Sequence, residues 1–203
     1  MQPLELYIHI PFCVKKCAYC DFLSGPAGEK EKEEYVKMLV DEIRNCPDTV
    51  QNYRVISIFF GGGTPSLLTG EQIGRLMDTV REIFTLDEDA EITMEMNPGT
   101  VTEEKLRKYR QAGVNRLSIG LQSVNDEELR LLGRIHTYEE FLEAYHLARA
   151  NGFSNINVDL ISAIPGQTVE SWRRTLEQVM ALSPEHISAY SLILEEGTTF
   201  YKK

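Results

Sequence analysis

Three cysteines stand close together near the start of the chain. Cys13, Cys17 and Cys20 follow the spacing Cys-x3-Cys-x2-Cys within the stretch IHIPFCVKKCAYCDF. Thiolates at this spacing bind zinc or an iron–sulfur cluster, and the two groups need different numbers of ligands. A structural zinc site takes four closed ligands, whereas a 4Fe-4S cluster held by three cysteines leaves one iron free for another ligand. The three thiols therefore predict an iron–sulfur site with one open iron.

Two other readings of the cysteines stay open. A zinc site would need His9 or Cys46 as its fourth ligand. A redox-active disulfide within the loop is the other alternative. Lys15 and Lys16 could favour the thiolate form and offset the negative charge of a cluster, or could be solvated loop residues. We expect Cys46, beyond the next helix, to have no part in the site.

A run of glycines forms the second candidate feature. FFGGGTP (Phe59–Pro65) directly follows an apolar run. Successive glycines let the backbone approach a ligand closely and adopt conformations closed to other residues. The spacing is not that of a dinucleotide-binding or P-loop motif, and the P-loop lysine is absent. Alone this is a weak signal, but beside a cluster loop it predicts contact with the polar head group of a ligand.

Apolar runs alternate with helical patterns along the chain, which predicts parallel strands joined by helices. The pattern indicates an α/β fold, an incomplete (β/α)6 TIM-like barrel of parallel strands with outer helices, and a doubly wound sheet is its competitor. The expected strands are Leu6–Ile10, Val55–Phe60, Glu91–Met96, Arg116–Leu121, Asn155–Ile161 and His186–Ile193. The expected helices span roughly 31–45, 70–84, 103–112, 138–151 and 169–182.

Within the expected strands, one set of alternate residues is apolar and the other is small or polar. Successive side chains of a strand face opposite sides of the sheet, so the polar set would line an open interior if helices cover the apolar set. Glu95, Gln122 and Asp159 belong to the polar set and lie near the carboxyl ends of their strands. In a barrel those ends carry the active-site loops. We expect the three to converge on a ligand, although each could be a structural polar residue.

Arg134, in the stretch LGRIH, is a further candidate. Its guanidinium could pair with a ligand carboxylate through two hydrogen bonds. A surface arginine is an equally good interpretation. His136, in the same stretch, has no visible partner, so we assign it no role.

The composition excludes some classes of function. The 203 residues carry a formal net charge of −10, which disfavours a general nucleic-acid binder because such proteins need a basic face. No stretch approaches the roughly 20 apolar residues of a membrane span, and the N-terminus lacks the basic region of a signal peptide. We therefore expect a cytoplasmic protein without an integral membrane segment.

Taken together, the motifs resemble those of the radical S-adenosylmethionine (radical SAM) superfamily. Within it the chain is most similar to the oxygen-independent coproporphyrinogen III oxidase family, and the resemblance covers essentially all 203 residues. It rests on YIHIPFC, CAYCDF, GGGTPS, NRLSIGLQS, LGRIH, VDLISAIPGQT and YSLILEEGT. It implies a 4Fe-4S cluster on Cys13, Cys17 and Cys20, with S-adenosylmethionine (SAM) bound to the open iron.

The resemblance also implies which residues contact SAM. They are Tyr7, Tyr19, Gly62, Gly63, Thr64, Glu95, Gln122, Arg134 and Asp159. Tyr19 would face the adenine, the segment from Gly62 to Thr64 the amino group, and Asp159 or Glu95 the ribose or amino groups. A reduced cluster would cleave SAM to methionine and a 5′-deoxyadenosyl radical, while the protein orients the reactants.

Three functions are compatible with the resemblance: a haem chaperone, an oxidase that decarboxylates coproporphyrinogen, and a radical enzyme acting on RNA, which the acidic charge disfavours. The oxidase branch has a further cysteine where this chain has Phe22, which favours the haem-chaperone branch. The implied partners are haem or a porphyrinogen, haem-accepting apoproteins, and an electron donor such as flavodoxin or ferredoxin.

Two further points follow from the resemblance. Ser162 and Ala163 replace the aromatic residue or methionine followed by glycine that relatives usually carry. Residues 1–203 are expected to be the radical SAM core domain alone, without the C-terminal region associated with substrate or haem handling.

Overall fold

Six strands form one sheet in the order β1-β2-β3-β4-β5-β6, and every neighbouring pair is parallel. The protein is described here from a computed structural model, over residues 1–202. The strands are β1 (Gln2–Ile10), β2 (Tyr53–Gly62), β3 (Thr85–Met96), β4 (Arg116–Gln122), β5 (Ile156–Ser162) and β6 (His186–Ser191). Because chain order and spatial order agree, each strand lies beside the one that follows it in the sequence.

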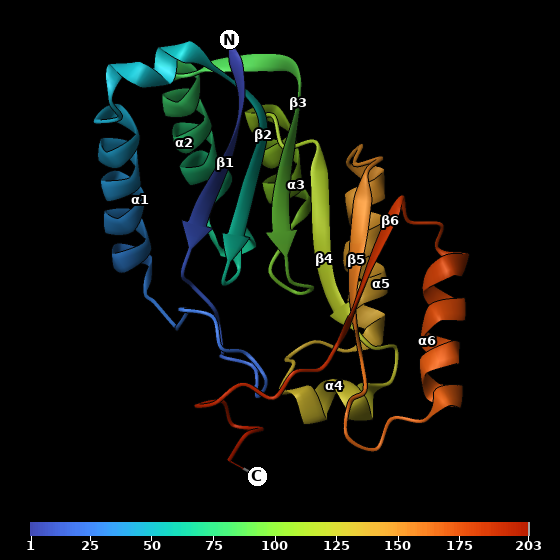
Figure 1. The fold of residues 1–203 in the computed structure, drawn as a ribbon. Helices are drawn as coiled ribbons and strands as arrows, with labels where there is room; N and C mark the ends of the chain where they lie inside the picture. Colours follow the sequence, from blue (N-terminus) through green and yellow to red (C-terminus); the bar gives the residue numbers. More distant parts are fainter. Residues whose placement is uncertain (203) are drawn as a thin grey trace.

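Helices follow the strands, and all of them except the short helix 126–132, which lies at the carboxyl ends of the strands, cover one face of the curved sheet (Figure 1). They are α1 (Glu29–Arg44), α2 (Gly70–Ile83), α3 (Glu103–Ala112), α4 (Asp126–Leu132), α5 (Tyr138–Ala150) and α6 (Val169–Ala181), with short 3-10 turns η1 (Asp48–Asn52) and η2 (Pro65–Leu67). A doubly wound sheet would reverse its strand order and carry helices on both faces. The arrangement therefore confirms the partial (β/α)6 barrel and rules out its competitor.

The sequence patterns that begin the helices are present in the structure. Thr69 caps α2 by accepting a hydrogen bond from the Gln72 backbone N–H, and the Gln72 side chain returns the contact. Thr137 and Glu140 do the same for α5. Such capping boxes satisfy backbone N–H groups that have no partner within the helix. The two capping boxes define where α2 and α5 begin.

The predicted alternation of apolar and polar side chains along the strands is also present in the structure. In β3, Ile92, Met94 and Met96 are each at most 4% exposed because the helices cover them. Thr93 and Glu95 alternate with them and face the interior of the half-barrel. Burying apolar side chains of this size contributes about 1.5–3 kcal/mol each, so this register is strongly preferred over its one-residue slip.

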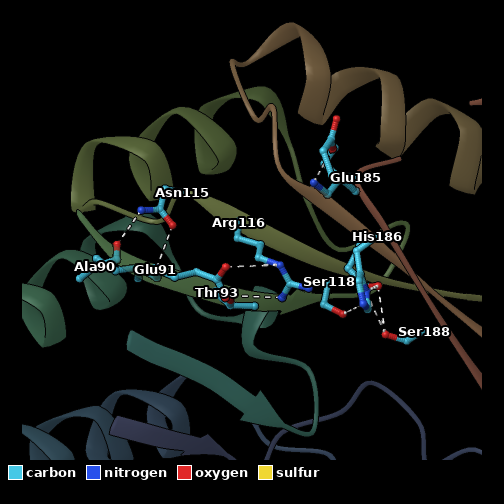
Figure 2. A network of polar contacts seen from close by, with 12 residues as sticks. Ala90, Glu91, Thr93, Asn115, Arg116, Ser118, Glu185, His186 and Ser188 are labelled. Atoms are coloured by element: carbon cyan, nitrogen blue, oxygen red, sulfur yellow. Dashed lines mark hydrogen bonds and ion pairs between the residues drawn. The ribbon is translucent and has the colours of Figure 1, made fainter. Parts of the chain in front are cut away.

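The interior face carries a network of polar contacts (Figure 2). The Asn157 amide donates to the hydroxyl of Ser118 at 2.7 Å and to the carboxylate of Asp159 at 2.8 Å. Its carbonyl oxygen accepts from the Ser188 hydroxyl at 3.0 Å and bonds to the His186 ring. The inner wall of β4, β5 and β6 is thus polar and internally satisfied, as the strand pattern predicts.

Over residues 1–202, no helix is both long enough and apolar enough to cross a membrane.

Candidate functional site

The three cysteines lie on the loop that leaves the carboxyl end of β1 and runs to α1. The loop is closed at its base, where the Cys13 backbone N–H donates to the Gly25 carbonyl at 2.9 Å and the Gly25 N–H returns to the Pro11 carbonyl at 3.0 Å. Further along, the Ala18 N–H donates to the carbonyl of Leu132, the last residue of α4, at 2.9 Å. The loop is therefore held in shape without regular secondary structure of its own.

All three thiols are partly buried, and none of the four cysteines forms a disulfide in the described part of the chain. The same residues contain no group of three or more His, Cys, Asp and Glu side chains that could hold a single metal ion. A 4Fe-4S cluster makes a different demand, because each thiolate ligates a different iron and the sulfurs stand apart. Among the described residues, neither His9 nor Cys46 lies with the three thiols in such a group.

Cys46 lies past the end of α1, with its thiol within 3.8 Å of the Glu42 carbonyl and its side chain against the hydrophobic core. It is remote from the cysteine loop in both sequence and packing.

Two of the three sulfurs accept hydrogen bonds from other elements. The Thr64 hydroxyl, after β2, lies 3.6 Å from the Cys13 sulfur. The Arg134 guanidinium, after α4, places Nη1 3.7 Å from the Cys17 sulfur. Burial raises the pKa of the third thiol, Cys20, with smaller contributions from the neighbouring thiols. Donors to cysteinyl sulfur stabilise the thiolate form that a cluster requires.

Open space borders the thiols. A cavity of about 320 Å³ is lined by Cys17, Cys20 and Lys16 on one side and by the segment Glu196–Thr199 on the other. The Phe200 backbone N–H donates to the Ala18 carbonyl at 3.0 Å, so the C-terminal segment lies along the cysteine loop (Figure 1).

The glycine run at the end of β2 is packed against β1 and the cysteine loop. Gly62 has φ of 111°, a left-handed conformation that favours glycine. A Cβ on Gly63 would lie 2.5 Å from the Phe12 carbonyl oxygen, closer than real Cβ atoms approach. Gly62, Gly63 and Thr64 already donate their backbone N–H groups to Glu95, Ile10 and Phe12. An ammonium group only donates, so what this segment can offer it is carbonyl oxygen.

We expect Gly63→Ala to release the cysteine loop, because the added methyl group collides with the backbone of Phe12, the residue before Cys13. The variant should fold, since the collision is at the rim, but take up several-fold less iron on anaerobic reconstitution. Iron content and the visible absorbance of the cluster measure the effect. Gly74→Ala is the control, because a Cβ there meets no atom within 4 Å among the described residues outside its chain neighbours and the backbone of its own helix. Equal iron uptake by both variants would contradict the expected role.

Glu95 and Asp159 give the interior wall its negative charge. Neither carboxylate forms an ion pair with any residue of the range 1–202. Glu95 accepts one hydrogen bond, from the Gly62 N–H at 3.0 Å, and Asp159 accepts from Ser118 at 2.8 Å. Burial, and secondarily the charge of Asp159, raise the pKa of Glu95 to about 7. A partly buried carboxylate pair without a cation is a setting for a cationic ligand.

Gln122 ends β4 in a strained conformation. Its φ is 77°, and the register of β4 against β5 shifts between Gly120 and Gln122. The side chain is buried at the carboxyl end of the strand. Left-handed backbone at a non-glycine residue costs of order 1–3 kcal/mol and persists where the surroundings impose it. The shift turns the amide of Gln122 toward Gly120, on the interior side.

The protein holds Arg134 through both terminal nitrogens of its guanidinium. Nη2 donates to the Gly120 carbonyl at 2.7 Å and to the Asn97 side-chain oxygen, while Nε is buried without a partner in the described residues. An orphaned buried donor of this kind is what a ligand carboxylate can satisfy. The guanidinium is therefore not a surface arginine, and it lies between Cys17 and the interior wall.

The two tyrosines differ in their exposure: Tyr7 lies on β1, and Tyr19 lies within the cysteine loop. Tyr7, on β1, is 59% exposed, with its hydroxyl 3.2 Å from His9 Nδ1. Tyr19 packs on a small apolar cluster with Leu132 and Phe200, and burial raises the pKa of its hydroxyl. Tyr7 thus presents its ring to the open face, whereas the ring of Tyr19 is largely covered.

Two features of the site are not evident from the sequence. Asn97, just past β3, bonds to both Thr64 and Arg134, a junction that the strand pattern alone does not reveal. Ala163 has φ of 58°, a left-handed conformation that glycine would adopt without the Cβ penalty. His136 is buried, and its pKa is lowered to about 3 by burial and by Arg134.

The donor set fits an iron–sulfur cluster and SAM. All three thiols are reduced, Cys17 and Cys20 border the cavity, and Cys13 and Cys17 accept hydrogen bonds. SAM carries an ammonium group, a sulfonium group and a carboxylate. The unpaired Glu95 and Asp159 suit the cations, and the orphaned Nε of Arg134 suits the carboxylate.

The fold and this site define a class of iron–sulfur-binding half-barrels, and comparisons with known proteins give the same result. Residues 7–179 match the model of the Radical SAM superfamily. The heme chaperone HemW of Escherichia coli strain K12 is 46% identical over 98% of this chain and 53% of its own length. The mitochondrial radical S-adenosyl methionine domain-containing protein 1 of Danio rerio is 38% identical over 98% of this chain and 45% of its own length.

Among solved structures, coproporphyrinogen III oxidase (HemN) from Escherichia coli superposes with a TM-score of 0.87 at 37% identity, over 95% of this chain and 44% of that one. The chain spans about half the length of the curated relatives it matches. It belongs to the radical SAM superfamily.

Proposed function

We propose that this chain is the cluster- and SAM-binding core of a haem chaperone. The observation that carries the proposal is the loop with Cys13, Cys17 and Cys20 at one rim of the half-barrel, beside interior carboxylates that have no cation partner among residues 1–202. A bound 4Fe-4S cluster supplies one-electron chemistry and an open iron. The residues of the chain would hold and orient the groups around it.

The proposed division of work follows from the contacts. Thr64 and Arg134 donate to the cysteinyl sulfurs. Glu95 would accept the ammonium group of SAM, with the carbonyl oxygens of Gly62 and Gly63, and Arg134 its carboxylate. Asp159, aligned by Ser118 and Asn157, would accept from the ribose. The proposed SAM contacts also include Tyr7, Tyr19 and Gln122. The proposal takes residues 1–203 to form a single radical SAM core domain.

The chaperone is favoured over the oxidase on two grounds. Phe22 stands where the oxidase branch has a further cysteine, and this residue is 64% exposed in the cysteine loop. Relatives named heme chaperone HemW match at 35–46% identity. The proposal includes haem as cargo, haem-accepting apoproteins, and a flavodoxin or ferredoxin as electron donor. It places the protein in the cytoplasm, which keeps thiols reduced.

The oxidase remains the second candidate, because a coproporphyrinogen III oxidase superposes on the whole fold at 37% identity. The two functions are distinguished by incubating the complete gene product with coproporphyrinogen, SAM and a reductant under anaerobic conditions. We expect no porphyrin product at catalytic rates, and we expect haem to bind and to pass to an apoprotein. Catalytic formation of the decarboxylated product would contradict the chaperone proposal.

The core of the proposal has its own test. The protein is reconstituted with iron and sulfide in the absence of oxygen, and its EPR spectrum is recorded with and without SAM. We expect the spectrum of the reduced cluster to change when SAM is added, because SAM would bind the open iron. A spectrum that SAM leaves unchanged would overturn the open-iron proposal.

A further inference from the structure

Asn97 joins the two hydrogen bonds that reach the cysteinyl sulfurs. Its side-chain Nδ2 donates to the Thr64 hydroxyl oxygen at 2.7 Å, and its Oδ1 accepts from Nη2 of Arg134. Thr64 in turn contacts the Cys13 sulfur, and Arg134 the Cys17 sulfur. A continuous chain of contacts therefore runs from Cys13 through Thr64, Asn97 and Arg134 to Cys17.

The chemistry of the groups fixes the direction of these bonds. A guanidinium can only donate, so the atom of Asn97 that faces Arg134 must be its carbonyl oxygen. The amide nitrogen of Asn97 therefore faces Thr64, and it too can only donate. Because the Thr64 oxygen receives that proton, the single hydroxyl proton of Thr64 is left for the Cys13 sulfur. An asparagine at this position therefore leaves the Thr64 hydroxyl as a donor to the Cys13 sulfur and holds the guanidinium that donates to the Cys17 sulfur.

The backbone of Asn97 is held on both sides, so its amide is fixed in place. Its N–H donates to the Ser66 hydroxyl at 3.3 Å, and its carbonyl accepts from the Thr100 hydroxyl at 2.7 Å. The two hydroxyls contact each other at 2.6 Å, and Nζ of Lys105 donates to the Thr100 carbonyl at 2.9 Å. A side chain held in this way is preorganised for its partners.

We propose that Asn97 is a positioning residue for the iron–sulfur site, which directs the Thr64 hydroxyl and the Arg134 guanidinium toward two cluster cysteines. The inference rests on the cluster binding in the proposed function and adds a residue to it. Hydrogen bonds to cysteinyl sulfur withdraw negative charge and favour the reduced cluster. Asn97 thus raises the reduction potential of the cluster through residues that contact the sulfurs.

The test is a redox titration, followed by EPR, of the reconstituted full-length protein and its variants. In Asn97→Asp the carboxylate accepts the hydroxyl proton of Thr64, which removes the donor to Cys13. We expect the ratio of reduced to oxidised cluster at a fixed potential to fall about tenfold, which corresponds to about 59 mV for a one-electron couple. Thr64→Val should cause a similar fall, and Thr64→Ser, which keeps the hydroxyl, should restore the wild-type ratio.

A double variant separates the proposed path from the added charge. If Asn97→Asp acts through the Thr64 hydroxyl, its effect should be much smaller in a Thr64→Val background, because the bond is already lost. Full additivity of the two shifts would overturn the inference, since charge alone would then explain Asn97→Asp. Asn97→Leu adds no charge and should also lower the ratio of reduced to oxidised cluster. It therefore provides the same test if the aspartate variant folds poorly.

Asn115→Ala is the matched control. Asn115 also bridges two segments, accepting from the Ile92 N–H and donating to the Ala90 carbonyl, but it lies just before the first residue of β4, beside the middle of β3 (Figure 2). We expect it to reduce the free energy of unfolding without changing the redox ratio. A wild-type protein that takes up no cluster would overturn the proposed function and this inference together. A cluster that titrates alike in wild type, Asn97→Asp and Asn97→Leu would overturn the inference alone.

Discussion

Cys17→Ala is expected to abolish cluster binding, and Cys46→Ala is expected to leave it intact. A three-cysteine site has no spare ligand, and the Cys17 sulfur is also the one that Arg134 contacts at 3.7 Å. After anaerobic reconstitution, wild type and Cys46→Ala should each hold about four irons and four sulfides per chain, and Cys17→Ala a small fraction of that. Iron and sulfide analysis, with EPR of the reduced protein, measures the difference.

Cys46→Ala is a matched control because it removes one partly buried thiol without touching the loop. Truncating a thiol against the core lowers stability modestly, so the comparison should be made at a temperature well below unfolding of both variants. Equal loss of iron from the two variants would show that the ligand set includes Cys46. Retention of a full cluster by Cys17→Ala would show that Cys17 is no ligand.

The fold was predictable from sequence because its parallel strands are buried and strongly patterned. The predicted and observed strand boundaries differ where pairing with a neighbouring strand extends a strand through residues whose composition disfavours it. Strand β3 begins at Thr85 and not at Glu91, since Thr85 and Leu86 pair with Arg54 and Val55 although the intervening residues are acidic. The helix α4 was missed because it has seven residues, although its Asn125 N-cap and the Gly133 that ends it were visible signals.

The placement of the candidate site residues was predictable where it depends on strand parity and on the spacing of one loop. Parity alone selects Glu95, Gln122 and Asp159 as interior residues at strand ends. Parity could not reveal the role of Asn97. This residue has the same parity but follows the last residue of the strand, and its partners Thr64 and Arg134 are 33 and 37 residues away in the sequence. Nor could parity decide the environment of Arg134, because a contact with Cys17 spans 117 residues of sequence. Contacts between residues so far apart in the sequence can be recognised only in the three-dimensional structure.

Glu95→Gln is expected to stabilise the ligand-free chain at alkaline pH and to weaken SAM binding. Burial raises the pKa of Glu95 to about 7, against an ordinary 4.5. Between those values the folded chain keeps a proton that the unfolded chain has released, so this contribution to stability is complete below pH 4.5 and is lost as pH rises through 7. Above pH 7 the wild type carries a partly buried charge that the amide avoids.

At pH 8 the free energy of unfolding of Glu95→Gln should therefore exceed that of wild type by up to about 3 kcal/mol, and at pH 5 the two should be nearly equal. Urea unfolding of the ligand-free chain at the two pH values measures this. Glu91→Gln is the control, since that carboxylate lies on the same strand but is exposed and should not change the pH dependence above 6. If the free energy of unfolding of Glu95→Gln changed with pH in parallel with that of wild type, the raised pKa assigned to Glu95 would be contradicted.

The Glu95→Gln substitution should weaken SAM binding, although it raises the stability of the ligand-free chain. A cationic ligand needs the ionised carboxylate, so the affinity of the reconstituted wild type should fall about tenfold per pH unit below 7, and that dependence should disappear in Glu95→Gln. SAM would then raise the unfolding free energy of wild type more than that of the variant, in proportion to affinity. The two measurements together distinguish a ligand site from a structural carboxylate. A structural carboxylate would lose stability on substitution, whereas a ligand site gains stability and loses its ligand.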